Sequence, residues 1–513
     1  MMATAPAFRT ILDLLQHGRA DAPAIGAPER NPLDYAGLRA LCAATIATLN
    51  AAGISRNDRV AIVLPNGPEM AAAFVAIAAG ATTAPLNPAY RADEFEFYLT
   101  DLKAKALVVL AEDAGPARAV AEKLGVPIVA LRPEPSSGAG AFSLAPPAAL
   151  IGTAAQPGPA AAGDIALVLH TSGTTSRPKI VPLSHANVCA SASHIVTTLA
   201  LQPGDSCLNI MPLFHIHGLM AAVLSSLAAG ASVICTPGFN ALKFFGWLEA
   251  TKPSWYTAVP TMHQTILARA ERNKEIIARA KLRLIRSSSA SLPPQVMTAL
   301  EAAFNAPVIE SYGMTEAAHQ MASNPLPPRV RKPGSVGIAA GPDIAIMDEG
   351  GQLLAPDQTG EIVIRGPNVT GGYEANPDAN LKAFAGGWFR TGDQGVMDGG
   401  GYLRITGRLK EIINRGGEKV SPLEVDEILM DHPAVQQVVT FAIPHDKLGE
   451  EVGAAIVLRE GETLSEQALK DFASKRLTDF KVPRKIVFLQ EIPKGATGKL
   501  QRIGLAQKLG LGS

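Results

Sequence analysis

The sequence predicts an α/β protein, and three observations support this fold class. Over most of the first 330 residues, short β-branched runs alternate with alanine-rich helical stretches, a pattern typical of parallel βαβ units. The length of 513 residues gives room for roughly three or four folding units. The sequence changes in character near residue 334 and again near residue 408, which predicts two smaller units after the α/β part.

The α/β part is expected to contain two related layers. Its candidate strands cover residues 59–64, 106–110, 165–169, 232–236, 255–258, 282–286 and 308–311, with helices such as 68–79 and 242–251 between them. Residues 76–86 and 224–237 repeat one layout, in which a helix stops at a glycine and the chain re-enters a sheet. Residues 133–163, rich in Pro, Ala, Gly and Ser, are predicted to form a surface connection.

Two smaller units are expected to follow. Candidate strands at residues 344–347, 360–365 and 402–405, broken by Gly, Pro and Asp-Gly, predict a small antiparallel β subdomain. Beyond residue 408 the sequence predicts a helix at 422–431, strands at 435–442 and 453–457, a helix at 465–477 and a strand at 485–488. This order indicates a compact α+β domain of about 100 residues, with its boundary at residues 408–410.

The composition excludes several classes of protein. Lys and Arg together number 46, as do Asp and Glu, so no overall field recruits nucleic acid or an acidic membrane surface. The most hydrophobic segment, 218–235, holds two glycines, whereas a spanning helix needs about 20 strongly apolar residues, so we expect a buried helix running into a strand. The four cysteines form no CxxC pair, and the N-terminus lacks a secretory layout. We therefore expect a cytoplasmic protein with no nucleic-acid partner and no integral membrane association.

The most informative segment runs from residue 167 to residue 179. An apolar run at 165–169 predicts a buried strand that leads into a loop of small hydroxyl and glycine residues. The backbone N–H groups and hydroxyls of such a loop can surround an anion, and a lysine adds positive charge. The residues concerned are Thr171, Ser172, Gly173, Thr174, Thr175 and Lys179. They predict a site for the polyphosphate of a nucleotide.

Three further segments carry groups that suit a nucleotide. One of them supplies an aromatic face, hydroxyls and a carboxylate, through Glu310, Ser311, Tyr312, Gly313, Met314, Thr315 and Glu316. Asp393 lies in a tight turn, where it could accept hydrogen bonds from two ribose hydroxyls, although Asp is also a common turn former. Lys499 lies in a loop near the C-terminus, and the GxxxxGK[ST] spacing of a P-loop nucleoside triphosphatase is absent there. His215 and His217 form an HxH pair, but without Cys or acidic partners at ligand spacing a zinc site is disfavoured.

These motifs, in this order over essentially the whole chain, resemble those of the adenylate-forming superfamily of acyl-CoA synthetases, luciferases and peptide-synthetase adenylation domains. Within that superfamily the sequence is most similar to the oxalate–CoA ligases of plants and fungi. The similar stretches are residues 170–179, 212–218, 255–260, 286–292, 314–319, 323–327 and 413–419. Ser176 and Ile180 stand where the superfamily usually has glycine. Ser176 followed by Arg177 resembles the oxalate-type loop, whereas Ile180 has no explanation in the sequence.

The resemblance implies a fold and a reaction. It implies a large N-terminal domain, residues 1–407, of two α/β layers plus a small β-barrel at about 334–407. A mobile C-terminal α+β domain, residues 411–513, would turn about a hinge near Lys410. The implied reaction is an AMP-forming acid–CoA ligation, in which a carboxylic acid reacts with ATP in the presence of Mg²⁺, and coenzyme A then takes the acyl group.

The resemblance also implies roles for individual residues. Lys499 would neutralise charge between the carboxylate and the α-phosphate, Thr171 to Thr175 would hold the β- and γ-phosphates, and Glu316 would ligate Mg²⁺. Asp393 and Arg408 would hold the ribose, and Glu310 to Tyr312 would flank the adenine. The remaining residues assigned to the nucleotide are Lys179, Gly313 and Thr315, and those assigned to the hinge and coenzyme A are Lys410, Gly416, Gly417 and Lys419.

The acyl pocket decides the substrate, and by resemblance His215, Ser289 and His319 line it. A pocket for a fatty or aromatic tail is apolar, whereas two imidazoles and a hydroxyl suit a second carboxylate. Oxalate is therefore the favoured substrate and malonate the second. Other hypotheses stay open: a medium-chain or aromatic acid–CoA ligase, an adenylating enzyme that loads a carrier protein, and a nucleotide-binding regulator without catalysis. Both Ser289 and His319 could also be hydrogen-bonded interior residues.

Overall fold

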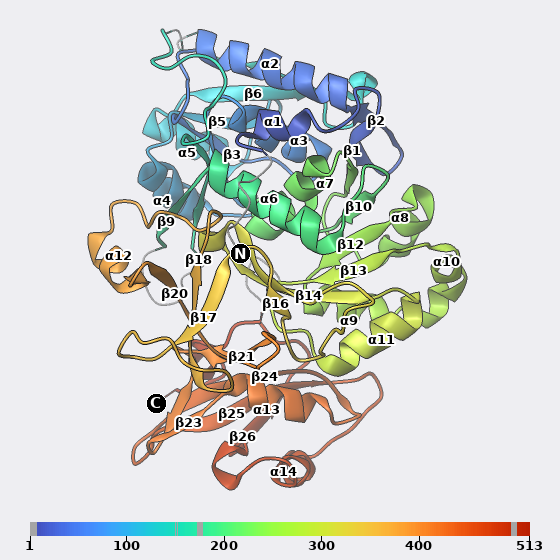
Figure 1. The fold of residues 1–513 in the computed structure, drawn as a ribbon, viewed down its shortest axis with the longest axis vertical. Coiled ribbons are helices and arrows are strands. Elements are labelled where there is room, and N and C mark those ends of the chain that lie inside the picture. The colour runs from blue at the N-terminus through green and yellow to red at the C-terminus, as the bar shows by residue number, and fades with distance from the viewer. Residues whose placement is uncertain (1–7, 149, 151, 172–177, 494–499, 513) are drawn as a thin grey trace.

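The computed structural model describes residues 8–148, 150, 152–171, 178–493 and 500–512. Two mostly parallel sheets with helices around them form the body of the molecule, and a smaller domain lies at one end (Figure 1). This is the α/β architecture that the sequence predicts, with a large N-terminal domain and a smaller C-terminal one. No helix in the described ranges is long and apolar enough to cross a lipid bilayer.

The first sheet has nine strands. In spatial order they are β16 (Ile338–Ala339), β15 (His319–Ser323), β14 (Val308–Met314), β13 (Leu284–Ser287), β12 (Trp255–Ala258), β10 (Ser206–Asn209), β11 (Ser232–Cys235), β1 (Pro23–Ala27) and β2 (Arg30–Asp34). The strands from β14 to β1 run parallel, and β2, β15 and β16 are antiparallel to their neighbours. The carboxyl ends of the parallel strands therefore share one edge, where ligands bind in such sheets.

The second sheet has seven strands. Their order is β7 (Phe142–Ala145), β6 (Ile128–Pro133), β5 (Ala106–Leu110), β3 (Arg59–Ile62), β4 (Thr82–Pro85), β8 (Ile165–His170) and β9 (Ile180–Ser184). Only β7 and β9 are antiparallel. The prediction of a surface connection over residues 133–163 was wrong at β7, because residues 142–145 return along β6 as a hairpin and bury Phe142.

The helices of the large domain fill the space between and around the two sheets. They are α1 (Ile11–Leu15), α2 (Tyr35–Ala51), α3 (Pro68–Ala78), α4 (Ala92–Leu102), α5 (Pro116–Leu124), α6 (His185–Leu199), α7 (Ser225–Ala228), α8 (Phe244–Thr251), α9 (Pro260–Leu267), α10 (Lys274–Arg279) and α11 (Pro294–Phe304). Helix α3 contacts strands of both sheets, and ten of its residues are buried. A helix that is apolar on every side is stable only in such a place.

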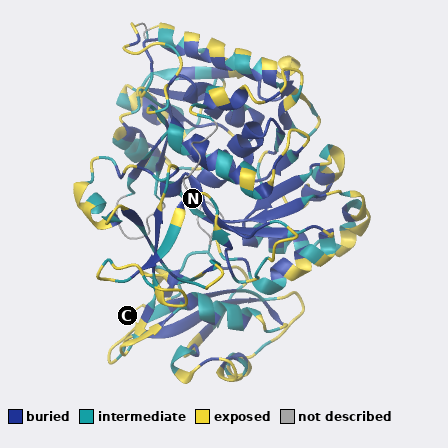
Figure 2. Cartoon of the chain, in the orientation of Figure 1, coloured by how far each residue is buried: buried dark blue, intermediate teal, exposed yellow. Residues whose placement is uncertain are grey.

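The repeated layout noted in the sequence is confirmed. Helix α3 leads into β4 of the seven-stranded sheet. A π-helix, η2 (His217–Leu224), continues as α7 and leads into β11 of the nine-stranded sheet. The hydrophobic segment 218–235 is thus a buried helix running into a strand, as predicted (Figure 2).

The β subdomain is a five-stranded antiparallel sheet. Its elements are β17 (Asp343–Met347), β18 (Thr359–Arg365), α12 (Pro377–Ala383), β19 (Phe384–Ala385), β20 (Trp388–Met397) and β21 (Leu403–Arg408). Strand β20 pairs with β18 on one edge and with β19 and β21 on the other. Among the described residues, no strand pairing joins β17 to β19 or β21, so the five strands form an open sheet. The resemblance implied a closed barrel.

The C-terminal domain is the α+β unit that the sequence predicts. It comprises β22 (Ile413–Arg415), β23 (Glu418–Val420), α13 (Pro422–Met430), β24 (Val435–His445), β25 (Gly449–Leu458), α14 (Glu466–Ser474), β26 (Lys485–Phe488) and α15 (Leu505–Lys508). Its sheet has the order β23-β22-β25-β24, with β26 parallel to β25. This sheet packs on α13 and α14 around a core of its own.

Candidate functional site

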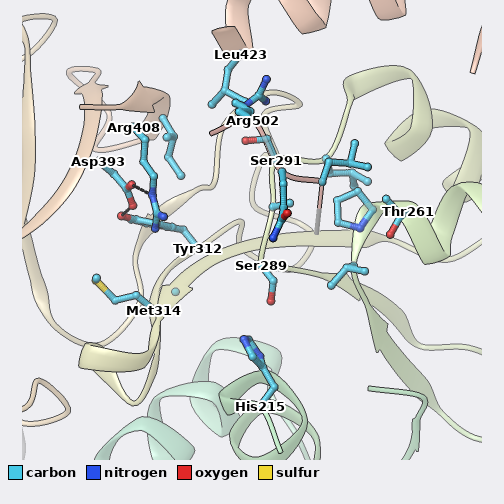
Figure 3. A pocket seen from close by; sticks show the side chains of 18 of the residues that line it. His215, Thr261, Ser289, Ser291, Tyr312, Met314, Asp393, Arg408, Leu423 and Arg502 are labelled. Carbon is cyan, nitrogen blue, oxygen red and sulfur yellow. Dashed lines mark hydrogen bonds and ion pairs between the residues drawn. The ribbon is translucent and has the colours of Figure 1, made fainter. Parts of the chain in front are cut away.

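A cavity of about 480 Å³ lies between the large domain and the C-terminal domain. The large domain contributes the residues at or just after the carboxyl ends of β4, β8, β12 and β13, and part of β14. The C-terminal domain contributes α13 and residues 500–503. Figure 3 shows the two sides, with Leu423 and Arg502 facing Ser289 and His215 across the cavity. A ligand in this cavity would therefore touch both domains.

One corner of the cavity presents a buried carboxylate. Asp393, in β20, is 7 % exposed, and its Oδ2 accepts a hydrogen bond from the hydroxyl of Tyr312 in β14. Its Oδ1 accepts from Nε of Arg408 at 3.0 Å (Figure 3). Burial, and then the nearby Asp393 charge, raises the pKa of the Tyr312 phenol well above its ordinary value, so this tyrosine stays protonated and donates. The corner joins three residues that the sequence assigned to the nucleotide.

The ends of the predicted phosphate loop are held together. Strands β8 and β9 form a hairpin, and the loop connects them. The backbone N–H of Thr171 donates to the carbonyl of Lys179 at 2.9 Å, and the N–H of Lys179 donates to Oγ1 of Thr171 at 3.1 Å. Thr171 lines the cavity. The predicted phosphate ligands Ser172, Gly173, Thr174 and Thr175 lie outside the described residues.

The hairpin explains the isoleucine that the sequence left unexplained. Ile180 is the first residue of β9, pairs with His170, and is 8 % exposed. Its side chain packs in the cluster that includes Ala61, Ala84 and Val168. A glycine would leave this part of the core unfilled, so an apolar side chain here stabilises the root of the loop.

Positive and negative groups converge around Tyr373, next to Lys179 at the C-terminal end of the predicted phosphate loop. The Nζ of Lys179 lies 4.3 Å from the centre of the Tyr373 ring, and the Tyr373 hydroxyl donates to Oε1 of Glu316 at 2.7 Å. Burial raises the pKa of Glu316, and burial followed by the charge of Lys410 lowers the pKa of Lys179. A polyphosphate with a divalent cation would offset both effects, because it brings negative charge to the lysines and positive charge to the carboxylate.

At the acyl end, the structure separates the three predicted substrate residues. His215 and Ser289 line the cavity, whereas His319, which is 1 % exposed, is not among its lining residues. Oγ of Ser289 lies 2.9 Å from Nδ1 of His217, and the imidazoles of His217 and His319 stack with centroids 5.0 Å apart. The expectation that His319 lines the pocket is therefore corrected: it stands one layer behind the wall.

Gly313 forms the wall in front of His319. A Cβ on Gly313 would lie 1.7 Å from the carbonyl oxygen of His319 and 3.3 Å from its Nδ1. The register between β14 and β15 shifts at this residue. Only glycine allows the two strands to approach so closely, and the approach sets how far β14 projects into the cavity.

Glu310 also stands behind the wall. It is 2 % exposed and is not a lining residue; its Oε1 accepts the backbone N–H of Leu292 at 2.8 Å. In this position Glu310 supports the loop of residues 288–292. It does not reach the cavity, where the resemblance implied a contact with adenine. Thr315 begins the short helix η4 (Thr315–Ala317), which carries Glu316.

Glu310 makes stability depend on pH. Burial raises the pKa of its carboxyl to about 8, above the value of about 4.3 in an unfolded chain. The folded protein then binds more protons than the unfolded one, so this group's contribution to the free energy of unfolding falls as pH rises from about 4.3 to 8. We expect Glu310→Gln to remove that fall. The free energies of unfolding of wild type and variant are measured by urea denaturation at pH 5, 6.5 and 8. The value of the variant should rise relative to that of the wild type as pH rises. A difference between the two that does not change with pH would contradict this role.

The C-terminal side of the cavity is held by one arginine. Arg502 donates from Nη2 to Oδ2 of Asp426 in α13 at 2.6 Å, and its Nε lies 3.4 Å from Oε2 of Glu411. Arg502 follows Lys499 by three residues, and Glu411 follows Lys410 directly. Lys499 itself lies outside the described residues. The ion pairs thus tie the segment after Lys499 to the segment that joins the two domains.

The residues assigned to the hinge and coenzyme A are not among those that line the cavity. Lys410 is exposed between β21 and β22. Gly416, Gly417 and Lys419 are exposed in the β22–β23 hairpin, and none of them lines the cavity. Their role with coenzyme A therefore stays a prediction that requires the C-terminal domain to turn.

Comparison with known proteins assigns the family. The AMP-binding enzyme model matches residues 15–374, and the AMP-binding enzyme C-terminal domain model matches residues 424–499. The chain belongs to the AMP-binding enzyme family. It is 47 % identical to an oxalate–CoA ligase of Arabidopsis thaliana, over 89 % of each chain. It is 42 % identical to an oxalate–CoA ligase of Saccharomyces cerevisiae, over 88 % of this chain and 87 % of the relative.

The fold agrees with solved structures of the same kind. The ATP-bound crystal structure of MatB from Rhodopseudomonas palustris superimposes with a TM-score of 0.86 at 30 % identity, over 98 % of each chain. As an AMP-binding enzyme with these relatives, the protein is an ATP-dependent acid–CoA ligase, an acyl-CoA synthetase. ATP, coenzyme A and a carboxylic acid are accordingly its expected substrates.

Several residues of the cavity region were missed by the sequence analysis. His217 was weighed only as a metal ligand, Arg286 was noted only as part of a predicted strand and of a similar stretch, and Asp426 and Arg502 were given no role. For Arg286 a signal existed: a charged residue stands inside the apolar strand β13, where an arginine is rarely tolerated without a partner. Asp426 and Arg502 reach the cavity through the arrangement of the two domains, and no local pattern marks them.

Proposed function

We propose that this acid–CoA ligase activates a short dicarboxylate, oxalate first and malonate second. The observation that carries the proposal is the polar acyl end of the cavity. His215 and Ser289 line this end, and the lining of the same cavity also includes Thr261 and Gln264; all four side chains can hydrogen-bond. A fatty or aromatic tail would offer these groups no hydrogen bond, whereas a carboxylate accepts from them, and each hydrogen bond to a charged group that is forgone costs about 1.5–3 kcal/mol. The names of the two relatives in Arabidopsis and yeast support the same substrate.

The first step joins the acid to AMP. A carboxylate oxygen attacks the α-phosphorus of ATP, the bond to the β-phosphate breaks, and pyrophosphate leaves. Two anions approach each other in this step, so cations and oriented donors must offset their repulsion. We assign this task to Lys499, Lys179 and the loop of residues 171–175. Asp393 would accept hydrogen bonds from the ribose, with Arg408 and Tyr312 holding its carboxylate in place.

Glu316 suits a magnesium ion. Mg²⁺ binds hard oxygen ligands and is commonly held by one or two carboxylates together with substrate phosphates and water. Glu316 offers a buried carboxylate near Lys179, which follows the predicted phosphate loop, and its burial-raised pKa marks a charge that lacks sufficient compensation. When bound, the ion would neutralise charge on the phosphates, and Tyr373 would orient the carboxylate through its hydrogen bond.

The second step transfers the acyl group to sulfur. The thiolate of coenzyme A attacks the acyl carbon, and AMP leaves with the oxygen that came from the acid. Lys499 must then make way for the thiol. Rotation about Lys410 would remove residues 494–499 and bring residues 414–419 toward the cavity. Arg502, Glu411 and Asp426 lie on the same side of Lys410, so their ion pairs would move as one body.

A panel of acids tests the proposed substrate. Thioester formation with oxalate, malonate, acetate, octanoate and coumarate should be fastest with oxalate, with malonate second. The physical reason is that only a diacid supplies a second carboxylate to the polar end of the cavity. The measurement is kcat/KM for each acid with ATP and coenzyme A. A higher value for octanoate or coumarate than for either diacid would contradict the proposal.

A further inference from the structure

One buried cation lies directly behind the acyl end of the cavity. Arg286, in β13, is fully buried, and no carboxylate among the described residues forms an ion pair with it. Within the part of the chain that the structure describes, its Nε has no hydrogen-bond partner. A buried charge without an opposite charge is costly, and for stability alone an apolar side chain of similar size would serve better. The positive charge of Arg286 would therefore be balanced by an anion that is not part of the protein, such as a bound ligand.

The guanidinium meets two imidazoles. Its Nη2 lies 3.1 Å from Nε2 of His319, and its Nη1 lies 3.4 Å from Nε2 of His217. A third contact, to Oε1 of Gln320, is 3.5 Å long. The two rings stack, so both present the same edge to the arginine.

These contacts fix where the imidazole protons lie. A guanidinium only donates hydrogen bonds, so each Nε2 that it faces must accept. The protons of both neutral rings then lie on Nδ1. Oγ1 of Thr257, 2.6 Å from Nε2 of His217, supplies a further donor to the same nitrogen. The Nδ1–H of His217 consequently points at Oγ of Ser289, 2.9 Å away.

The hydroxyl group of Ser289 is therefore expected to donate its proton to a group in the cavity. Its oxygen accepts from His217, which leaves its own hydroxyl proton for a group in the cavity that it lines. Its backbone φ of 75° is rare for a residue with a side chain, and strained conformations of this kind gather at functional sites. In Figure 3 the Ser289 side chain points toward His215, on the side of the cavity away from Arg502.

We propose that Arg286 is a positioning residue that gives the enzyme its preference for a second carboxylate, acting through His217 and Ser289. The inference rests on the proposed function and names the residue behind its specificity. The chain of hydrogen bonds from Arg286 through His217 to Ser289 forms a relay. Through this relay, Arg286 favours an anionic group in the cavity without contacting it. The distal carboxylate of the acid then supplies the negative charge that Arg286 lacks in the protein.

The test compares a diacid with a monoacid of the same length. For wild type, Arg286→Met, Arg286→Lys and Ser289→Ala, kcat/KM is measured for oxalate and for acetate, with the KM for ATP as a further readout. We expect Arg286→Met to lower kcat/KM for oxalate about tenfold or more, as for the loss of a hydrogen bond to a charged group, and to change the value for acetate and the KM for ATP little. Arg286→Lys should lose part of the preference, since an ammonium lacks the planar fork that reaches both imidazoles.

Two comparisons separate specificity from structure. The double variant of Arg286→Met and Ser289→Ala should be no worse with oxalate than Ser289→Ala alone, because both changes break one relay. Arg283→Met is the matched control: this neighbouring arginine pairs with Asp205 at 2.8 Å outside the cavity, and its loss should leave the oxalate-to-acetate ratio unchanged.

The outcomes are decisive. Equal losses for oxalate and acetate in Arg286→Met, or fully additive losses in the double variant, would overturn the inference. Should Arg286→Met not fold, Arg286→Lys decides in the same way, and equal losses for the two acids would again overturn it. A wild-type enzyme that prefers octanoate or coumarate would instead contradict the proposed function itself.

Discussion

Replacing Lys499 by Ala is expected to abolish formation of the adenylate while sparing the transfer of a supplied adenylate to coenzyme A. The acid and the α-phosphate are both anionic, and removal of a positioned cation or donor from such a transition state costs about 10²–10³ in rate. The measurement has two parts: acid-dependent exchange between ATP and pyrophosphate, and release of AMP from chemically prepared acyl-adenylate with coenzyme A. Only the first should fall.

The matched control for this variant is Lys494→Ala. Lys494 lies five residues earlier in the same sequence loop and has no assigned role, so both half-reactions should keep the wild-type rate. Equal losses of the two half-reactions in Lys499→Ala would show that the lysine supports the fold of the C-terminal domain instead. The ion pairs of Arg502 with Asp426 and Glu411 would be the next place to look for such support.

Replacing Asp393 by Ala is expected to weaken ATP binding far more than it slows the chemical step. Its carboxylate is 7 % exposed and already held by Tyr312 and Arg408, so it is pre-oriented toward the cavity. Two hydrogen bonds from a ribose to a charged acceptor are worth about 1.5–3 kcal/mol each. The KM for ATP should therefore rise by two orders of magnitude or more, an increase of about 2.7 kcal/mol in binding free energy.

Asp398→Ala provides the comparison. Asp398 follows β20 in the same subdomain and pairs with Lys332 at 2.5 Å, but it does not line the cavity. This variant should bind ATP as the wild type does. An unchanged KM for ATP in Asp393→Ala, with a loss of kcat alone, would refute the ribose assignment.

Much of the fold could be predicted because its signals are local. Strands β5 and β12 have the bounds predicted from their apolar runs, and the α+β pattern after residue 408 is confirmed. Short polar strands could not be predicted from their sequences. Strand β2, with the sequence Arg-Asn-Pro-Leu-Asp, is the edge strand of the nine-stranded sheet, and it is a strand because it pairs with β1. The hairpin of β6 and β7 was missed because its Pro- and Gly-rich connection is typical of loops.

Part of the candidate site could also be predicted from the sequence, and part could not. Asp393 and Tyr312 were predicted from short motifs and Arg408 from the resemblance to the family. They meet in space through the pairing of β20 with β21 and the packing of β14 beside them. The layer behind the wall could not be predicted. Arg286, His217 and His319 come from β13, η2 and β15, so only the tertiary structure brings their side chains together. For the same reason the resemblance placed His319 and Glu310 at the surface of the pocket, whereas neither is among its lining residues.

The most direct test of the account follows one oxygen atom. Oxalate labelled with ¹⁸O in both carboxylates is incubated with the enzyme, ATP, Mg²⁺ and coenzyme A, and the nucleotide product is analysed by mass spectrometry. Attack of a carboxylate on the α-phosphorus followed by thiolysis predicts AMP that carries one ¹⁸O, in step with formation of the thioester. Unlabelled AMP, or ADP as the product, would contradict activation of the acid as an adenylate.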